Sequence, residues 1–280
     1  MALWKVESAA GGVALATYTN PPMNYFCAEG TRELGELVRQ WSDPAVRAVV
    51  LTGGIAGKFI THYSVEELAA LAADRAGMRA LGPALNHGYH ELLASLRNLP
   101  KPVIVAMNGD TMGGGFELSL ACDIRIAASG DHRIGLPEVT LGILPGGSGT
   151  QRLARLIGAS RAIDFILRGR ICRPEEALAL GLVHEVAPDA LVRARALASS
   201  LAELSPVAIA EIKRAVYQGA ELHLEAGLVI EGEAFMATMA SDEGLAAMNA
   251  YVAQPLERRR DWLERRAALA HPAPGGRARA

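Results

Sequence analysis

The sequence predicts a mixed α/β core followed by a helical C-terminal region. Strand-like runs rich in β-branched residues, such as 46–52 and 103–107, alternate with runs of helical periodicity over the first part of the chain. Such alternation is typical of α/β folds. From Pro174 onward the pattern is almost entirely helical. Half of the 280 residues are hydrophobic and 21% are charged, as in ordinary globular proteins.

Each strand is predicted from a β-branched or alternating run that proline, glycine or asparagine bounds. Asn20-Pro21-Pro22 ends the second run, and Pro100-Lys101-Pro102 precedes the central one. In chain order, the expected strands cover residues 4–8, 12–19, 46–52, 103–107, the segment from Asp123 onward, and 133–136.

Helices are predicted where apolar residues recur three and four positions apart and a stop signal follows. Pro174 is placed as a first helical residue and Gly181 as a stop, whereas Ser148 to Gln151 has the form of a capping box. In chain order, the expected helices cover residues 28–42, 65–73, 81–97, a short segment from about 115, 149–157, 174–180, 205–219, 224–239 and 242–252, with a last short helix around Trp262.

The domain organisation follows from these elements. We expect an α/β core over 1–200, a helical region over 201–260 and a flexible tail over 261–280, because the end of the chain is basic and rich in Ala, Pro and Gly. The helices between 205 and 252 carry more apolar residues than one core can cover, which indicates a subunit interface. These residues are Ile209, Ile212, Val216, Leu228, Ile230, Phe235 and Met236.

Charge and cysteine content exclude several classes of function. A formal net charge of −2 offers no bulk attraction for nucleic acid or an anionic membrane. The cysteines, Cys27, Cys122 and Cys172, are odd in number, widely spaced and without a C-x-x-C pair, which argues against disulfides and structural zinc and favours a reducing compartment. No basic leader precedes an apolar run, and no run approaches the length of a membrane span. We expect a cytoplasmic protein.

The candidate site lies in the stretch from 103 to 128. An apolar strand leads there into Gly113-Gly114-Gly115, and Glu117 follows on an otherwise apolar helical segment. Glycines let a ligand approach bare backbone N–H groups, and a helix starting at about Gly115 would point its positive end at that ligand. A carboxylate in such a segment needs donors or a shifted pKa. The pattern predicts a place that holds an oxyanion beside a carboxylate.

Another glycine-bearing loop, 53–59, resembles a phosphate-binding loop only superficially. The spacing from Gly53 to Gly57 is one residue short, and Phe59 stands where the magnesium-binding hydroxyl would be. The dinucleotide fingerprint also fails, because Leu118 stands where its last glycine would fall. The sequence therefore predicts neither a nucleotide cofactor nor a metal.

Several linked motifs resemble the signature of the crotonase superfamily, the enoyl-CoA hydratases and isomerases. They occur in the family's order and extend weakly from the first strands to about residue 260. The motifs are Asn108-Gly109, Gly113 to Glu117, Cys122 to Arg125, Pro137 to Val139, Leu141-Gly142, Pro145-Gly146 and Thr150 to Leu153.

This resemblance implies a spiral of ββα units, a helical C-terminal region that packs trimers or hexamers, and an acyl-coenzyme A thioester as substrate, with no separate cofactor. It implies that the N–H groups of Gly114 and Tyr63 polarise the thioester carbonyl, with His62 beside them in the substrate-binding loop. It also implies that Glu117 and Glu138 hold and split a water.

The chain departs from the family pattern in ways that leave alternatives open. Many members carry a glycine or alanine pair and an aspartate where this chain has His62, Tyr63 and Ser64. Hydration of a 2-enoyl-CoA to a 3-hydroxyacyl-CoA is the first hypothesis. Isomerisation, hydrolysis or decarboxylation through the same enolate is the second, and a non-catalytic acyl-CoA-binding protein is the third.

The candidate residues also have structural explanations. Glu117 alone would fit a carboxylate that caps a helix, and Glu138 would fit a solvated loop residue. His62 would fit an exposed loop residue, and Cys122 fits core packing better than a nucleophile. The linked motifs favour the functional interpretation of both glutamates.

Overall fold

The computed structural model describes residues 2–270, and its largest element is a six-stranded sheet with the order β1-β2-β3-β5-β7-β10. β1 and β2 pair in antiparallel fashion, whereas the remaining neighbours are parallel. The strands are β1 (Trp4–Ala9), β2 (Val13–Tyr18), β3 (Ala48–Gly53), β5 (Val103–Met107), β7 (Ile124–Ala128) and β10 (Glu185–Ala187), with the 3-10 turn η1 (Ala10–Gly12) between the first two.

A second, four-stranded sheet runs in the order β4-β6-β8-β9. Its strands are β4 (Gly57–Lys58), β6 (Gly109–Met112), β8 (Ile134–Gly135) and β9 (Ile171–Cys172). Successive strands of the chain enter different sheets: β3 is followed by β4, β5 by β6 and β7 by β8. The chain therefore winds as a spiral of ββ units, with helices between the turns.

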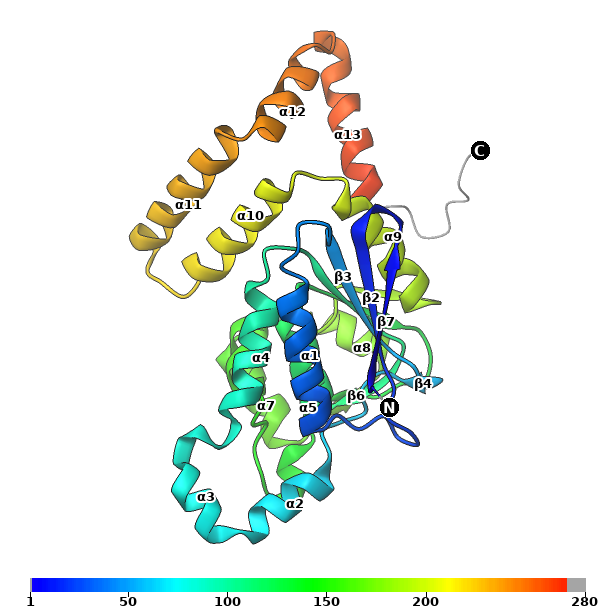
Figure 1. Ribbon diagram of the computed structural model, residues 1–280, viewed down its shortest axis with the longest axis vertical. Helices are drawn as coiled ribbons and strands as arrows, with labels where there is room; N and C mark the ends of the chain where they lie inside the picture. Colours follow the sequence, from blue (N-terminus) through cyan, green and yellow to red (C-terminus); the bar gives the residue numbers. More distant parts are fainter. Residues whose placement is uncertain (1, 271–280) are drawn as a thin grey trace.

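Helices cover both faces of the larger sheet (Figure 1). The core helices are α1 (Ala28–Gln40), α2 (Val65–Ala73), α3 (Arg75–Leu81), α4 (His87–Asn98), α5 (Gly113–Ala121), α6 (Gly149–Ile157), α7 (Ala159–Leu167), α8 (Pro174–Ala179) and α9 (Ala190–Ala202), with the 3-10 turns η2 (Gly82–Asn86) and η3 (Glu138–Leu141). Strand residues alternate between the two faces, so Val49 and Val105 pack with α1, α4 and α5, whereas Val50 and Ile104 pack with α9.

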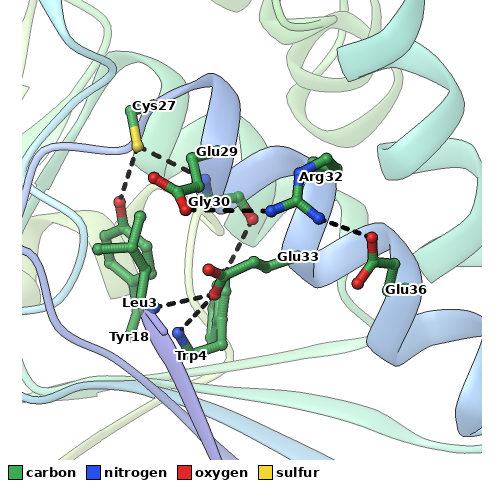
Figure 2. A network of polar contacts seen from close by, with 9 residues as sticks. All are labelled: Leu3, Trp4, Tyr18, Cys27, Glu29, Gly30, Arg32, Glu33 and Glu36. Carbon is green, nitrogen blue, oxygen red and sulfur yellow. Dashed lines mark hydrogen bonds and ion pairs between the residues drawn. The ribbon is translucent and has the colours of Figure 1, made fainter. Parts of the chain in front are cut away.

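The start of α1 is fixed to the first hairpin by a polar network (Figure 2). Glu33 accepts the backbone N–H groups of Leu3 and Trp4 at 2.9 and 3.0 Å, and the Trp4 indole donates to the Gly30 carbonyl. Cys27 caps the helix by accepting from the Gly30 N–H. This network fixes the end of the segment that precedes α1. That segment reaches the candidate site.

Most expected elements are confirmed, and the differences have local or tertiary causes. The expected helix over 81–97 is broken, because Gly82 adopts a φ of +56° and Pro83 follows, so α3 ends there and α4 begins only at His87. Sequence reasoning missed the helices α3, α7 and α9 and the strands β4, β6, β9 and β10, and it interpreted β6 as a turn. The missed strands are short and pair with strands distant in the chain, which a local pattern does not contain.

The C-terminal helices form an arm that extends from the core at the end opposite α2 and α3 (Figure 1). Asp123 holds its base, because the Lys213 ammonium and the Tyr217 hydroxyl each lie 2.7 Å from that carboxylate. The arm comprises α10 (Pro206–Gly219), α11 (Leu224–Met239), α12 (Asp242–Val252), η4 (Leu256–Arg258) and α13 (Arg259–Ala270).

Two further sequence expectations bear on this region. The tail expected from residue 261 was placed too early, since α13 continues to Ala270, and the rest of the expected tail lies outside the described residues. Within residues 2–270, no helix combines the length and the apolar character needed to cross a bilayer.

Candidate active site

A cavity of about 1170 Å³ opens between α2, α4, the start of α5 and the loop from Pro137 to Gly147. All five sequence-predicted site residues line it: His62, Tyr63, Gly114, Glu117 and Glu138. The structure therefore brings together residues from segments far apart in the chain. The cavity volume exceeds the usual range of about 300–1,000 Å³ for small-molecule pockets.

Helix α5 begins at Gly113, slightly earlier than the expected start near Gly115. Gly113 has a φ of +49°, which favours glycine, and no side chain caps the helix. A Cβ on Gly114 would lie 2.9 Å from the Tyr63 Cβ and 3.4 Å from the Tyr63 nitrogen. Because the first N–H groups of a helix lack intrahelical partners, the Gly114 donor is available beside the Tyr63 backbone.

The orientation of the Tyr63 backbone follows from a parallel bridge with Phe26. The Phe26 N–H donates to the His62 carbonyl at 2.8 Å, and the Ser64 N–H donates to the Phe26 carbonyl at 2.7 Å. In a trans peptide the N–H and C=O point in opposite directions, so the Tyr63 N–H points away from Phe26. It therefore faces Gly114 and the cavity, as an oxyanion donor must.

Glu117 is buried within α5, with 3% of its surface exposed. Its Oε1 accepts the Gly149 N–H at 2.6 Å, at the positive end of α6. Burial and, second, the nearby Glu138 charge raise its pKa to about 8, although the N–H groups of Gly149 and Gly147 oppose this shift. The carboxyl group is therefore largely protonated at neutral pH.

The predicted capping box at Ser148 to Gln151 is wrong. Ser148 adopts a φ of +78° and its side chain does not cap α6. Its hydroxyl instead accepts from the Arg152 side chain at 2.8 Å. The local pattern failed because Ser148 is left-handed and not extended, as a capping residue must be. The Gln151 N–H that the cap would have satisfied donates to the Ser148 backbone carbonyl at 3.0 Å, and Glu117 accepts the Gly149 N–H.

Glu138 lies at the start of η3 with 8% of its surface exposed. Burial raises its pKa to about 7. Among the described residues, its Oε2 is buried and has no hydrogen-bond partner. A Cβ on Gly113 would lie 3.1 Å from its Oε1, so the carboxyl group abuts the start of α5. A buried acceptor without a partner is a place where a water or a substrate atom can bind.

Sequence reasoning missed one face of α4 and the turn before it. The Tyr89 hydroxyl donates to the Gly114 carbonyl at 2.6 Å. The Asn86 amide lies 2.6 Å and the His90 Nε2 2.7 Å from the Gly146 carbonyl. These polar and aromatic residues are three and four positions apart, and that helical spacing is the signal that could have found them.

Within residues 2–270, no group of three or more His, Cys, Asp and Glu side chains is arranged to hold a metal ion. The arrangement can act through other means. Two backbone donors can stabilise a developing oxyanion, and two carboxyl groups with raised pKa values can move protons beside it. This combination is suited to an enzyme that stabilises an oxyanion on its substrate.

Comparison with known proteins identifies the family. The family model for enoyl-CoA hydratase/isomerase matches residues 8–265, and the chain belongs to this family, with the crotonase fold. A probable enoyl-CoA hydratase from Bacillus subtilis (strain 168) is 34% identical, with 86% of this chain and 92% of the relative covered. Mitochondrial methylglutaconyl-CoA hydratase from Mus musculus is 37% identical, with 75% and 67% covered. The crystal structure of an enoyl-CoA hydratase from Bacillus anthracis is 32% identical and has a TM-score of 0.81, with 89% and 95% covered.

Proposed function

We propose that this enzyme adds water across the double bond of a 2-enoyl-CoA thioester and produces a 3-hydroxyacyl-CoA. The observation that carries the proposal is the pair of buried carboxyl groups, Glu117 and Glu138, which line the same cavity as the Tyr63 and Gly114 backbones. The reaction needs no cofactor, because coenzyme A is part of the substrate.

The proposed reaction proceeds through an enolate. The water oxygen forms a bond to C3, and the electron pair of the C2=C3 bond moves onto the thioester oxygen. The N–H groups of Gly114 and Tyr63 stabilise this oxyanion. Glu138, with the lower pKa, takes a proton from the water, and protonated Glu117 delivers one to C2. Since the two carboxyl groups share one water, the hydroxyl at C3 and the proton at C2 are added to the same face of the double bond.

The residues that line the cavity favour a substrate whose acyl group is uncharged. Apolar side chains from α2, α3, η2 and the segment after Glu138 dominate it: Leu68, Leu71, Met78, Leu85, Leu141, Ile143 and Leu144. Among the described residues that line it, none is a lysine or arginine, and Glu67, Glu117 and Glu138 are carboxylic acids. An acyl chain with a second carboxylate would therefore be buried without a counter-charge, which is costly. We expect apolar acyl chains to be preferred.

A second candidate is double-bond isomerisation, and the bond between Glu117 and Gly149 favours it. If Glu117 serves mainly to hold α6, Glu138 alone would carry a proton between C2 and C4 of an enoyl-CoA. Hydrolysis, decarboxylation and simple acyl-CoA binding are further alternatives with less specific support.

We also propose that the enzyme assembles as a trimer or hexamer through its C-terminal arm. Ile212, Phe235 and Met236 are 61%, 64% and 67% exposed in the single chain. Such a concentration of exposed apolar side chains is typical of a subunit interface. A cytoplasmic location remains a prediction from the cysteine content.

The test is a panel of 2-enoyl-CoA thioesters, followed by the loss of absorbance of the conjugated thioester. The panel contains straight chains of increasing length and one chain that ends in a carboxylate. Loss of absorbance with a 3-hydroxyacyl-CoA product supports hydration. Conversion of a 3-enoyl-CoA to its 2-enoyl isomer without hydration would instead support isomerisation. Binding of coenzyme A esters without any turnover would favour a non-catalytic role.

A further inference from the structure

The segment that carries the proposed Tyr63 donor has an unusual side chain beside it. His62 Nδ1 lies 2.6 Å from the Tyr63 carbonyl oxygen. A carbonyl only accepts, so Nδ1 carries the proton and donates. The imidazole ring also stacks on Tyr25, with ring centroids 4.1 Å apart and planes at 25°. The histidine is therefore held in a defined orientation.

Tyr25 is itself firmly placed. Its carbonyl accepts from the Tyr18 hydroxyl and from the Asn20 side-chain amide, each at 2.8 Å. Tyr18 belongs to β2 and contacts Cys27 at the start of α1 (Figure 2). The backbone of the residue that stacks on His62 is thus connected to the hairpin and helix network of the N-terminal region.

The bridge between Phe26 and Tyr63 sets the direction of the Tyr63 carbonyl that His62 covers. The His62 carbonyl and the Ser64 N–H both point at Phe26. Because neighbouring peptide groups in an extended segment alternate in direction, the Tyr63 N–H and the Tyr63 C=O both point to the opposite side. A carbonyl oxygen therefore lies on the same side of the segment as the oxyanion donor. Its partial negative charge would oppose an oxyanion there unless a donor covers it.

We propose that His62 is a positioning residue for the oxyanion site, an inference that rests on the proposed function. Its Nδ1–H covers the Tyr63 carbonyl, offsets that dipole and fixes the peptide that follows the donor. The Nδ1–H acts on the backbone and not on the substrate. A side chain that donates from the same place should replace it, whereas one that donates from the Nε2 position should not.

The test compares His62→Asn, whose amide N–H corresponds to Nδ1, with His62→Gln, whose amide corresponds to Nε2, and with His62→Leu. His87→Leu, at an exposed histidine that does not line the cavity, is the matched control. The first readout is the absorption of bound cinnamoyl-CoA, a conjugated thioester whose spectrum moves to longer wavelength as its carbonyl is polarised. The second readout is the split between kcat and KM for hydration.

We expect His62→Leu and His62→Gln to lose at least half of the spectral shift at saturating ligand. They should also lower kcat about 10-fold while KM changes less than about 3-fold, since lost donors in oxyanion sites cost more than this when removed outright. His62→Asn and His87→Leu should stay close to the unmodified enzyme. If His62→Leu does not fold, the comparison of Asn with Gln decides the question alone.

Other results would contradict either the role of His62 or the proposed function, and they can be told apart. A full spectral shift in His62→Leu, or in His62→Gln, would overturn the proposal. Rescue by Gln but not by Asn would show that the imidazole acts from Nε2, directly on the substrate. An unmodified enzyme that shifts the chromophore but hydrates no enoyl-CoA would refute the proposed function and leave this role intact. An unmodified enzyme that binds cinnamoyl-CoA without any shift would overturn the role itself.

Discussion

The coupled titration of the two glutamates makes the sharpest prediction, because hydration requires them in opposite protonation states. Glu138, with a pKa of about 7, must be ionised to take a proton from water. Glu117, with a pKa of about 8, must be protonated to deliver one to C2. Activity should therefore fall below pH 7, where Glu138 becomes protonated, and above pH 8, where Glu117 becomes ionised.

The size of the effect follows from these values. With pKa values of about 7 and about 8, roughly 60% of the enzyme is in the active form at pH 7.5 and about 3% at pH 5.5 or 9.5. The predicted fall is about 20-fold on each side of the optimum. Because the groups interact, the two limbs give the pKa values of the pair.

The assay is kcat/KM for a 2-enoyl-CoA between pH 5.5 and 9.5, which reports the ionisations of the free enzyme. Residual activity of Glu138→Gln should lack the acidic limb, whereas Tyr63→Ala should keep both limbs. A flat profile, or an optimum near pH 5 with ordinary carboxyl pKa values, would refute the assignment of both groups to the reaction.

The remaining predictions concern catalysis, stability and assembly. Glu117→Gln and Glu138→Gln should each lower the rate of hydration on the order of 100-fold or more. The double variant should lose far less than the sum of the two effects, because both groups act on one water. An inactive Glu138→Gln beside an active Glu117→Gln would indicate isomerase chemistry. Tyr63→Ala should retain most turnover, whereas Tyr63→Pro removes the N–H and should cost on the order of 100-fold in kcat, so equal rates would place the donor elsewhere. The raised pKa of Glu117 contributes stability that is full below about pH 4.5 and is lost as pH rises through about 8. Urea unfolding should therefore show Glu117→Gln losing less stability than the unmodified protein between pH 5 and 9, by about 4 kcal/mol. Parallel losses of stability in the two proteins would contradict a buried Glu117 with a raised pKa. Light scattering should find a trimer or hexamer, and a stable monomer at micromolar concentration would rule out the proposed arm interface.

Where local chemistry is decisive, the sequence predicted the structure well. The strand over Val103–Met107 and the helices over Val65–Ala73 and Leu224–Met239 have the expected bounds, because periodicity and stop signals act within each segment. The site segment was also readable, since a glycine run before a carboxylate on an apolar helix has few purely structural reasons to occur.

What the sequence left undetermined depends on residues that meet only in the folded chain. The start of α6 appeared to be capped by Ser148, but the Ser148 hydroxyl accepts from Arg152, and Glu117 from α5 accepts the Gly149 N–H. Likewise, Tyr89 supports Gly114 from a helix whose start the local pattern misplaced. A local pattern can report only which groups need partners, because burial and distance decide between distant candidates.

The sequence by itself determined the alternation of strands and helices, the glycine-rich start of α5 and the presence of the carboxyl groups. Only the tertiary structure decided the pKa values of these carboxyl groups and the orientation of the backbone donor beside them. It buries Glu117 and Glu138 and so raises both pKa values, and it pairs Tyr63 with Phe26 so that a backbone N–H faces the cavity. The reason is physical: desolvation and backbone orientation are set by neighbours from other segments, and no local pattern contains them.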